Sequence, residues 1–215
     1  MKRTLGLTLL LFATLFSCMR QEKPLPAELS RAESVMWEHP DSALSILRSM
    51  PQSSLSSGKN YATWALLLAQ ARDKVYGKRL PDSLNIPFSD KLVQDAMDYF
   101  EKEGNLKRMA QTYYYKGQLL KDQKKITEAM PFFLKSKEMM TKLDEPLFTY
   151  LICQSLGNTY RYQDLYEESL VQLKDAYQYA LRSGNGERIS YALSELGRTY
   201  VHKNEMDSAL FYFGK

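Results

Sequence analysis

The residue types that carry most enzyme chemistry are scarce in this chain and are not grouped. His39 and His202 are the two histidines among 215 residues, and Cys153 is the one cysteine beyond the N-terminal segment. A nucleophilic cysteine needs a base beside it, and a zinc site needs Cys, His or carboxylate ligands at short spacing. Neither arrangement occurs. Cys153 falls at a helix-packing position, so we expect it to be a buried core thiol.

Carboxylates are plentiful, but their spacing does not indicate catalysis. Glu101/Glu103 and Glu167/Glu168 lie close together in the sequence, and we expect them on the solvent-facing sides of helices. No Gly-rich phosphate loop follows a strand. The 29 basic and 25 acidic residues leave a formal charge of +4, without the basic stripe typical of nucleic-acid binding. The sequence therefore predicts no enzyme, no cofactor, no metal site and no nucleic-acid partner.

One residue is placed for a different kind of chemistry, the attachment of lipid. After two basic residues, Leu5 to Phe16 form an uncharged run that is shorter than the roughly 20 residues of a transmembrane helix. Such a run is typical of a signal peptide. The sequence Leu15-Phe16-Ser17-Cys18 resembles the lipobox of bacterial lipoproteins. The resemblance implies that residues 1–17 are removed and that Cys18 carries palmitate or a similar lipid. A cleaved secretory signal and a retained membrane anchor are the alternatives.

The residues that follow Cys18 extend this prediction. Residues 18–26 are mostly polar and include Pro24 and Pro26, which favour an extended tether. The lipoprotein resemblance implies a location in the cell envelope of a Gram-negative bacterium. There the lipid would hold the chain to a membrane, by expectation the outer membrane, with the remaining residues in the periplasm or at the cell surface.

An internal repeat with a period of forty residues occupies the C-terminal half of the chain. The segments 111–137, 151–177 and 191–215 align without gaps. Each contains a glycine, a Leu or Tyr three residues later, a small residue twelve later and a large residue sixteen later: Gly117, Leu120, Ala129, Phe133; Gly157, Tyr160, Ser169, Leu173; Gly197, Tyr200, Ala209, Phe213. The glycine lets one helix approach its neighbour closely. The offset of four places the small and large residues on one helical face; the large residue is expected to fill the gap between helix pairs.

This pattern resembles the tetratricopeptide repeat (TPR) family. The resemblance implies an all-α fold, a right-handed α-solenoid of stacked antiparallel helix pairs that covers residues 27–215. Because the family period is about 34 residues, the additional residues must lie between one pair and the next. First helices are predicted at 107–122, 147–163 and 187–203, and second helices at 126–142, 166–182 and 206–215. On this reading the last repeat is truncated.

The same register extends upstream, since Asp41-Ser42-Ala43-Leu44 matches Asp207-Ser208-Ala209-Leu210. Further helices are predicted at 27–38, 41–50, 61–76 and 89–103, with a long loop over 77–88. This part resembles exported TPR proteins of Gram-negative bacteria. Some of those carry only a lipid anchor, whereas others continue into a DNA-binding or signalling region.

In a stacked solenoid the first helices line the concave inner surface. By the family's pattern, nine side chains are candidates for a binding groove: Gln111, Tyr114, Gln118, Lys121, Gln154, Asn158, Arg161, Tyr162 and Arg198. Their polar and aromatic character predicts binding of an extended peptide or a protein partner. The alternative is that several of the tyrosines pack between helices. The flanking lysines of the family's carboxylate clamp are missing.

Three functions follow from these observations. The first is a membrane-anchored scaffold that binds proteins or peptides in the cell envelope. The second is the sensory part of a membrane-bound regulator whose effector domain lies beyond residue 215. The third is a carbohydrate-binding lipoprotein, because tyrosines suit stacking against sugar rings.

Overall fold

The computed structural model describes residues 24–76 and 89–215, and these are all-helical. The described helices are α2 (Ala27–Val35), α3 (Pro40–Ser49), the 3-10 turn η1 (Gln52–Leu55), α4 (Gly58–Tyr76), α5 (Asp90–Glu103), α6 (Leu106–Asp122), α7 (Ile126–Met140), α8 (Pro146–Arg161), α9 (Tyr166–Ser183), α10 (Gly186–His202) and α11 (Met206–Phe213). Cys18, the signal segment and the loop at 77–88 lie outside the described residues. None of the described helices is both long and apolar enough to cross a membrane.

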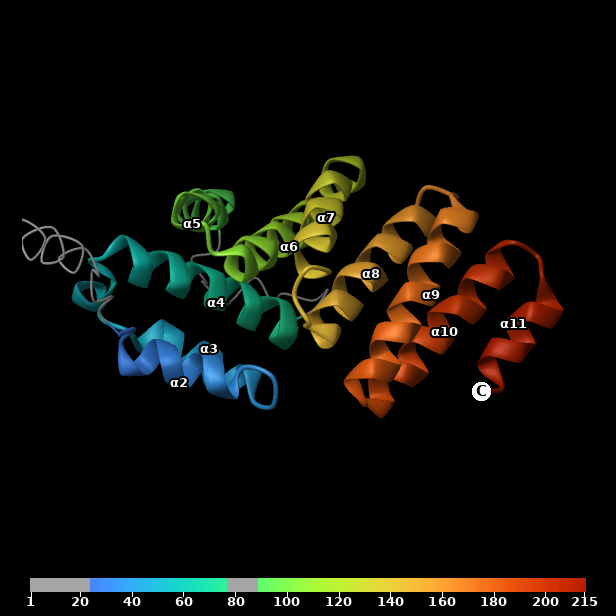
Figure 1. Cartoon of the computed structure of the whole chain (residues 1–215), viewed down its shortest axis with the longest axis horizontal. Helices are drawn as coiled ribbons and strands as arrows, with labels where there is room; N and C mark the ends of the chain where they lie inside the picture. The colour runs from blue at the N-terminus through green and yellow to red at the C-terminus, as the bar shows by residue number, and fades with distance from the viewer. Residues whose placement is uncertain (1–23, 77–88) are drawn as a thin grey trace, which may run out of the picture.

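The helices form a solenoid of antiparallel pairs that succeed one another from α2 and α3 to α10 and α11 (Figure 1). The first helices of the last three pairs begin at residues 106, 146 and 186, and the second helices at 126, 166 and 206. Both series advance by forty residues, as the sequence repeat predicts. The predicted right-handed α-solenoid is confirmed, and each predicted boundary in these pairs lies within two residues of the observed one.

Regular caps explain where the helices of the repeats begin and end. The side chains of Asn105 and Asn185 accept hydrogen bonds from the backbone N–H groups of Arg108 and Arg188 at the starts of α6 and α10. Such caps satisfy N–H groups that have no partner within the helix. Gly104 and Gly184 end α5 and α9 in the left-handed region, at φ 74° and 66°, where glycine is least strained.

Within each pair, the turn between the two helices uses a residue that is not glycine in the left-handed region. Lys124, Asp164 and Asn204 have φ values of 62°, 58° and 60°. They are spaced by forty residues, so the three turns are copies of one conformation. An L-residue with a Cβ is strained there, Asn and Asp less so than Lys.

The repeated glycine positions are close contacts between the two helices of one pair. A Cβ on Gly117 would lie 2.6 Å from Phe133, one on Gly157 2.6 Å from Leu173, and one on Gly197 2.5 Å from Phe213. The predicted role of the glycines is therefore confirmed. Each of the large side chains covers the glycine of its own pair, and Leu173 also belongs to a cluster with Leu196 of the next pair.

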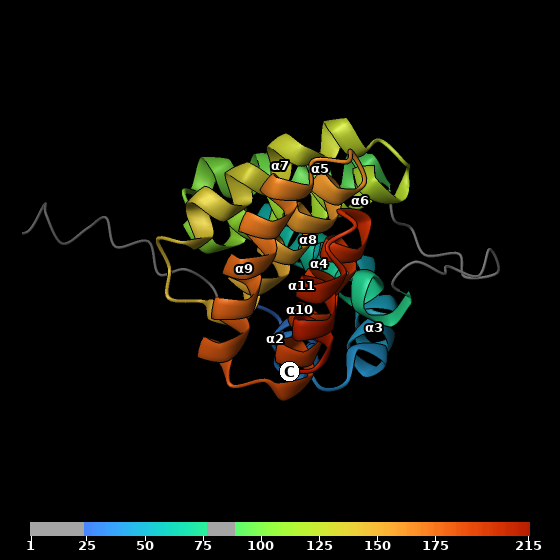
Figure 2. The same cartoon turned by 90° about the vertical axis from the view of Figure 1, so that its right-hand side faces the viewer.

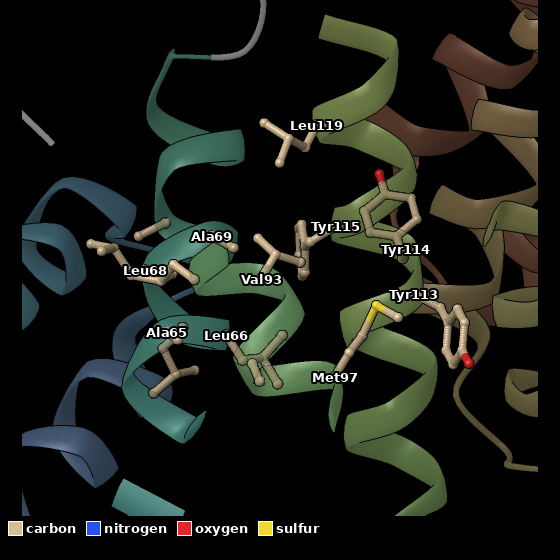
Figure 3. Packing of buried hydrophobic residues seen from close by; sticks show 14 of the residues in the cluster. Ala65, Leu66, Leu68, Ala69, Val93, Met97, Tyr113, Tyr114, Tyr115 and Leu119 are labelled. Atoms are coloured by element: carbon tan, nitrogen blue, oxygen red, sulfur yellow. The ribbon is translucent and has the colours of Figure 1, made fainter. Parts of the chain in front are cut away.

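The described core consists of one large cluster from α2 to α8 and two smaller clusters that involve α9 and α10, and aromatic rings fill part of the large cluster. Tyr114 and Tyr115 are almost fully buried in α6, where both rings pack edge-on against Phe148 of α8. Figure 3 shows Val93 and Met97 of α5 between the tyrosines of α6 and the leucines and alanines of α4. Cys153 is fully buried, as predicted.

Candidate binding groove

The first helices form the inner face of the solenoid. Helix α4 packs against both α2 and α6, and α8 contacts α10, whereas no two second helices of the described residues pack together in this way. In the end-on view α4, α8 and α10 lie near the middle together with α11, α9 lies toward the outside, and α6 lies beside α5 and α7 along one outer side (Figure 2). We call the inner surface of α4, α6, α8 and α10 the groove.

Hydrogen bonds between side chains link α4, α6 and α8 across the groove. Gln118 is at the centre of this network, since its Nε2 donates to Asp73 Oδ1 at 3.1 Å and its Oε1 accepts from Lys121 Nζ at 2.5 Å. Ser155 of α8 lies 3.5 Å from the same Oε1. Burial raises the pKa of the Asp73 carboxyl, and the positive charge of Lys121 opposes this shift. The network fixes the positions of polar groups that are only partly exposed.

A buried carboxylate holds two arginine side chains in place in the part of the groove formed by α8 and α10. Glu195 of α10 is 1% exposed, and its two carboxylate oxygens accept from Arg161 Nη2 at 2.7 Å and from Arg198 Nη1 at 2.8 Å. Arg161 Nη1 also lies 3.3 Å from Thr199 Oγ1. Because Arg161 holds a buried charge in place, it has a structural role in addition to any role in binding.

Two cations interact electrostatically, one near the end of α4 and the other near the start of α10. Lys74 Nζ lies 3.3 Å from the centre of the Trp37 ring, and the Arg188 guanidinium lies 5.5 Å from the Tyr150 ring. Burial, and next the charge of Arg188, lower the pKa of Lys74 to about 8. The Arg188 Nε is buried and has no hydrogen-bond partner in the described part of the chain. This end of the groove is therefore electropositive and flanked by aromatic rings.

The nine predicted groove residues differ widely in accessibility. Tyr162, at 64% exposed, and Arg198 are open to solvent. A second set is partly buried: Gln118, Lys121, Gln154, Asn158 and Arg161. Gln111 and Tyr114 are buried. The Tyr114 ring contacts Tyr115, Phe133 and Phe148, which is the helix-packing alternative stated for the tyrosines. Residues at equivalent repeat positions, such as Gln118, Asn158 and Arg198, share one face of the solenoid.

The sequence reasoning missed Asp73 and Glu195. Glu195 had a usable signal, because it stands two residues before the repeat glycine, where the other repeats have Tyr115 and Ser155. A carboxylate at a position that is buried in all three repeats indicates a buried ion pair. Asp73 had no such signal, since α4 lies outside the aligned segments.

The groove offers hydrogen-bond donors, acceptors and aromatic rings. Among the residues that the structure describes, no three His, Cys, Asp or Glu side chains are grouped as metal ligands. Burial raises the pKa of the Tyr114 hydroxyl well above 10 and that of Tyr150 to about 12. Both hydroxyls are therefore neutral hydrogen-bonding groups at physiological pH.

Known structures share this architecture. No family model matches the sequence, and no curated protein matches it. A Rap protein complexed with competence and sporulation factor superimposes with a TM-score of 0.69 at 15% identity, over 87% of this chain and 51% of that one. The chain has the TPR-type solenoid fold.

Two further structures support the same conclusion about the fold. A STAND (signal transduction ATPase with numerous domains) protein with a tetratricopeptide repeat sensor from Pyrococcus horikoshii matches with a TM-score of 0.65 at 16% identity, over 86% of this chain and 28% of that one. A structure of MamA matches with a TM-score of 0.53 at 15% identity, over 87% and 91%. The chain thus spans about half of the Rap protein and less than a third of the STAND protein.

Proposed function

We propose that this chain is a non-enzymatic scaffold whose groove binds an extended peptide or a segment of a partner protein. The observation that carries the proposal is the row of hydrogen-bonding side chains at equivalent repeat positions, from the partly buried Gln118 and Asn158 to the exposed Arg198. A solenoid presents such a row at regular intervals, which suits a ligand with a repeating backbone. The Rap structure, whose fold is similar, was determined as a complex with competence and sporulation factor.

The test compares groove and outer-surface variants in peptide binding. Peptides are selected from a random library on the full chain in detergent micelles, and their affinity is measured by calorimetry. Arg198→Ala should weaken binding by about tenfold, as for other accessible charged contacts. Tyr162→Ala should do the same.

Arg182→Ala is the matched control. The Arg182 side chain on α9 is 56% exposed and the Arg198 side chain 58%, and each forms an ion pair with a carboxylate. The partner of Arg182, Asp144, is 86% exposed, whereas the partner of Arg198, Glu195, is buried and keeps its ion pair with Arg161 when Arg198 is replaced. Arg182 belongs to a second helix and lies outside the groove. Equal affinities for the two arginine variants would contradict the proposal. Arg161→Ala is a poor probe, because it leaves the Glu195 charge buried without its main partner.

We further propose that the scaffold is attached to a membrane of the cell envelope through a lipid on Cys18. The support is the sequence resemblance of residues 15–18 to a lipobox. Metabolic labelling with a palmitate analogue should mark the wild-type chain and should not mark Cys18→Ser. An unlabelled wild-type chain would overturn this part of the proposal without affecting the groove.

A second candidate is the sensory portion of a larger regulator. It is favoured by the STAND structure, in which the part similar to this chain is 28% of a protein described as having a tetratricopeptide repeat sensor. The gene sequence beyond residue 215 separates the two candidates. A transmembrane span followed by an effector domain would establish the regulator.

A further inference from the structure

A small cavity opens at the N-terminal end of the solenoid, between first helices. Its volume is about 120 Å³, and its walls include Trp37 after α2, Gln70 of α4, Gln111 of α6 and Phe148 of α8. Lys107 and Glu145 also line it. The cavity is separate from the row of residues at Gln118, Asn158 and Arg198.

The side chain of Gln70 lines the cavity. The residue is 4% exposed, and the described part of the chain provides no hydrogen bond to its amide. Gln111 is also buried, and its Oε1 accepts from Arg108 Nη1 at 3.4 Å. The Nε2 group of Gln111 has no such partner among the described residues. Neither amide is among the described buried side-chain atoms that lack a partner, so both keep contact with solvent in the cavity, and a ligand must offer them hydrogen bonds in place of that solvent.

The charged side chains that line the cavity are already paired. Lys107 Nζ donates to Glu145, and Arg108 Nη2 donates to Glu33 Oε2 at 2.7 Å. Glu33 and Glu145 both line the cavity. An ionic ligand would lose its hydration and find no uncompensated opposite charge among the lining residues, which do not include the Lys74 that covers the Trp37 ring. A neutral ligand with both a donor and an acceptor suits this site.

Size and shape restrict the ligand further. Water occupies about 30 Å³ per molecule in the liquid, so the cavity corresponds to about four waters. The side chains of asparagine and glutamine have four and five non-hydrogen atoms, whereas a hexose has twelve. Trp37 and Phe148 provide flat apolar walls, against which a planar amide group packs well.

We propose that this cavity binds the side-chain carboxamide of an asparagine or glutamine in the peptide held by the solenoid. Gln70 offers its N–H and C=O groups to the ligand amide, and Gln111 adds an N–H donor. The inference rests on the proposed peptide-binding function and names one residue type that the peptide should contain.

Blocked tripeptides test the proposal without knowledge of the natural partner. Acetyl-Gly-Gln-Gly-amide and acetyl-Gly-Asn-Gly-amide are titrated into the full chain in detergent micelles and followed by NMR of side-chain N–H groups. The Trp37 indole and Gln70 amide signals should move. The signal of Trp64 should not, because its Nε1 is buried and donates to the Leu47 carbonyl oxygen at 2.9 Å.

The comparison ligands have the same backbone and a different central side chain. The Glu and Leu tripeptides should bind at least about tenfold more weakly, because one introduces a charge and the other leaves Gln70 unpaired. Equal binding of either ligand, or the absence of any shift, would overturn the proposal. So would equal shifts produced by glucose, which would indicate a carbohydrate site.

Gln70→Leu is the decisive variant. It removes the amide at similar size, so the melting temperature should not fall, while binding of the Gln tripeptide should weaken at least about tenfold. Gln178→Leu, at an exposed position of α9, is the control and should leave binding unchanged. Should Gln70→Leu not fold, Gln111→Met provides the same test. Unchanged tripeptide binding, together with library peptides that still respond to Arg198→Ala, would overturn this inference and leave the proposed function standing.

Discussion

Replacing Gly157 by alanine tests whether the repeat glycines exist because two helices approach closely. The new Cβ would lie 2.6 Å from Leu173 Cγ and 3.3 Å from the Ser169 carbonyl oxygen. Carbon atoms in contact are normally about 3.5–4.0 Å apart. Leu173 must therefore move by about 1 Å, and it is fully buried, so little space is available for that movement.

Two opposing effects determine how much Gly157→Ala changes the free energy of unfolding. Overpacking of this kind destabilises by about 1–3 kcal/mol. Replacing glycine by alanine within a helix stabilises by about 1 kcal/mol. We therefore expect the free energy of unfolding to fall by up to about 2 kcal/mol. Gly186→Ala, where no atom lies within 4 Å of the new Cβ, gives the alanine effect without the clash and should be neutral or stabilising.

The assay is urea unfolding followed by circular dichroism, with the midpoint and the m-value reported for each variant. The double variant Gly157→Ala/Leu173→Ala completes the test. Leu173→Ala alone should cost about 2–5 kcal/mol. In that background the alanine at 157 has space, so it should no longer destabilise, which gives a coupling of about 1–3 kcal/mol.

The equivalent glycine of the next repeat provides a comparison for the effect of Gly157→Ala. Gly197→Ala would produce a similar clash with Phe213, which is 50% exposed and can move toward solvent. Its cost should therefore be smaller than that of Gly157→Ala. A Gly157→Ala variant as stable as Gly186→Ala, or a double variant without coupling, would show that close helix packing does not require glycine at position 157.

Three further predictions concern other parts of the solenoid. Burial raises the pKa of the Cys153 thiol to about 12, so at pH 8 it should react with a disulfide reagent only at the rate of unfolding; rapid labelling of the folded chain would contradict its burial. The pKa of Lys74 is lowered from 10.5 to about 8, so the unfolded chain binds more protons between these values. Lys74→Met should therefore raise the melting temperature most below pH 8, with a gain that declines toward pH 10.5; a gain independent of pH would contradict this. Lys124→Gly removes left-handed strain at φ 62° and should stabilise by about 0.5–1 kcal/mol in urea unfolding, whereas Gly184→Ala, at φ 66°, should destabilise.

The sequence predicts most of the fold because each repeat contains the residues that bring its two helices into contact. The glycines at 117, 157 and 197 and the residues sixteen positions later place two helices in contact, and the forty-residue spacing sets the next pair. Helix ends were predictable where Gly104 and Asn105 mark a stop and a cap. The short turn η1 was not predicted, since Gln52 to Leu55 have no periodic pattern.

The groove was less predictable than the fold. Register alone places Gln118, Asn158 and Arg198 on one face, but it does not say how deeply each side chain is covered. Tyr114 occupies a groove position in the repeat pattern and is nevertheless 2% exposed, because Phe148 of the next pair packs against it. The cavity at Gln70 is formed where helices from four different pairs come together. No local pattern in the sequence predicts which residues of those helices line a common cavity.

The central claim is that the inner face of the first helices binds an extended peptide. A selected library peptide with a photoreactive benzophenone residue, cross-linked to the full chain and mapped by mass spectrometry, tests this claim most directly. We expect cross-links on α6, α8 and α10 near Gln118, Asn158 and Arg198, and their loss when unlabelled peptide competes. Competed cross-links confined to the outer helices α7 and α9 would contradict it.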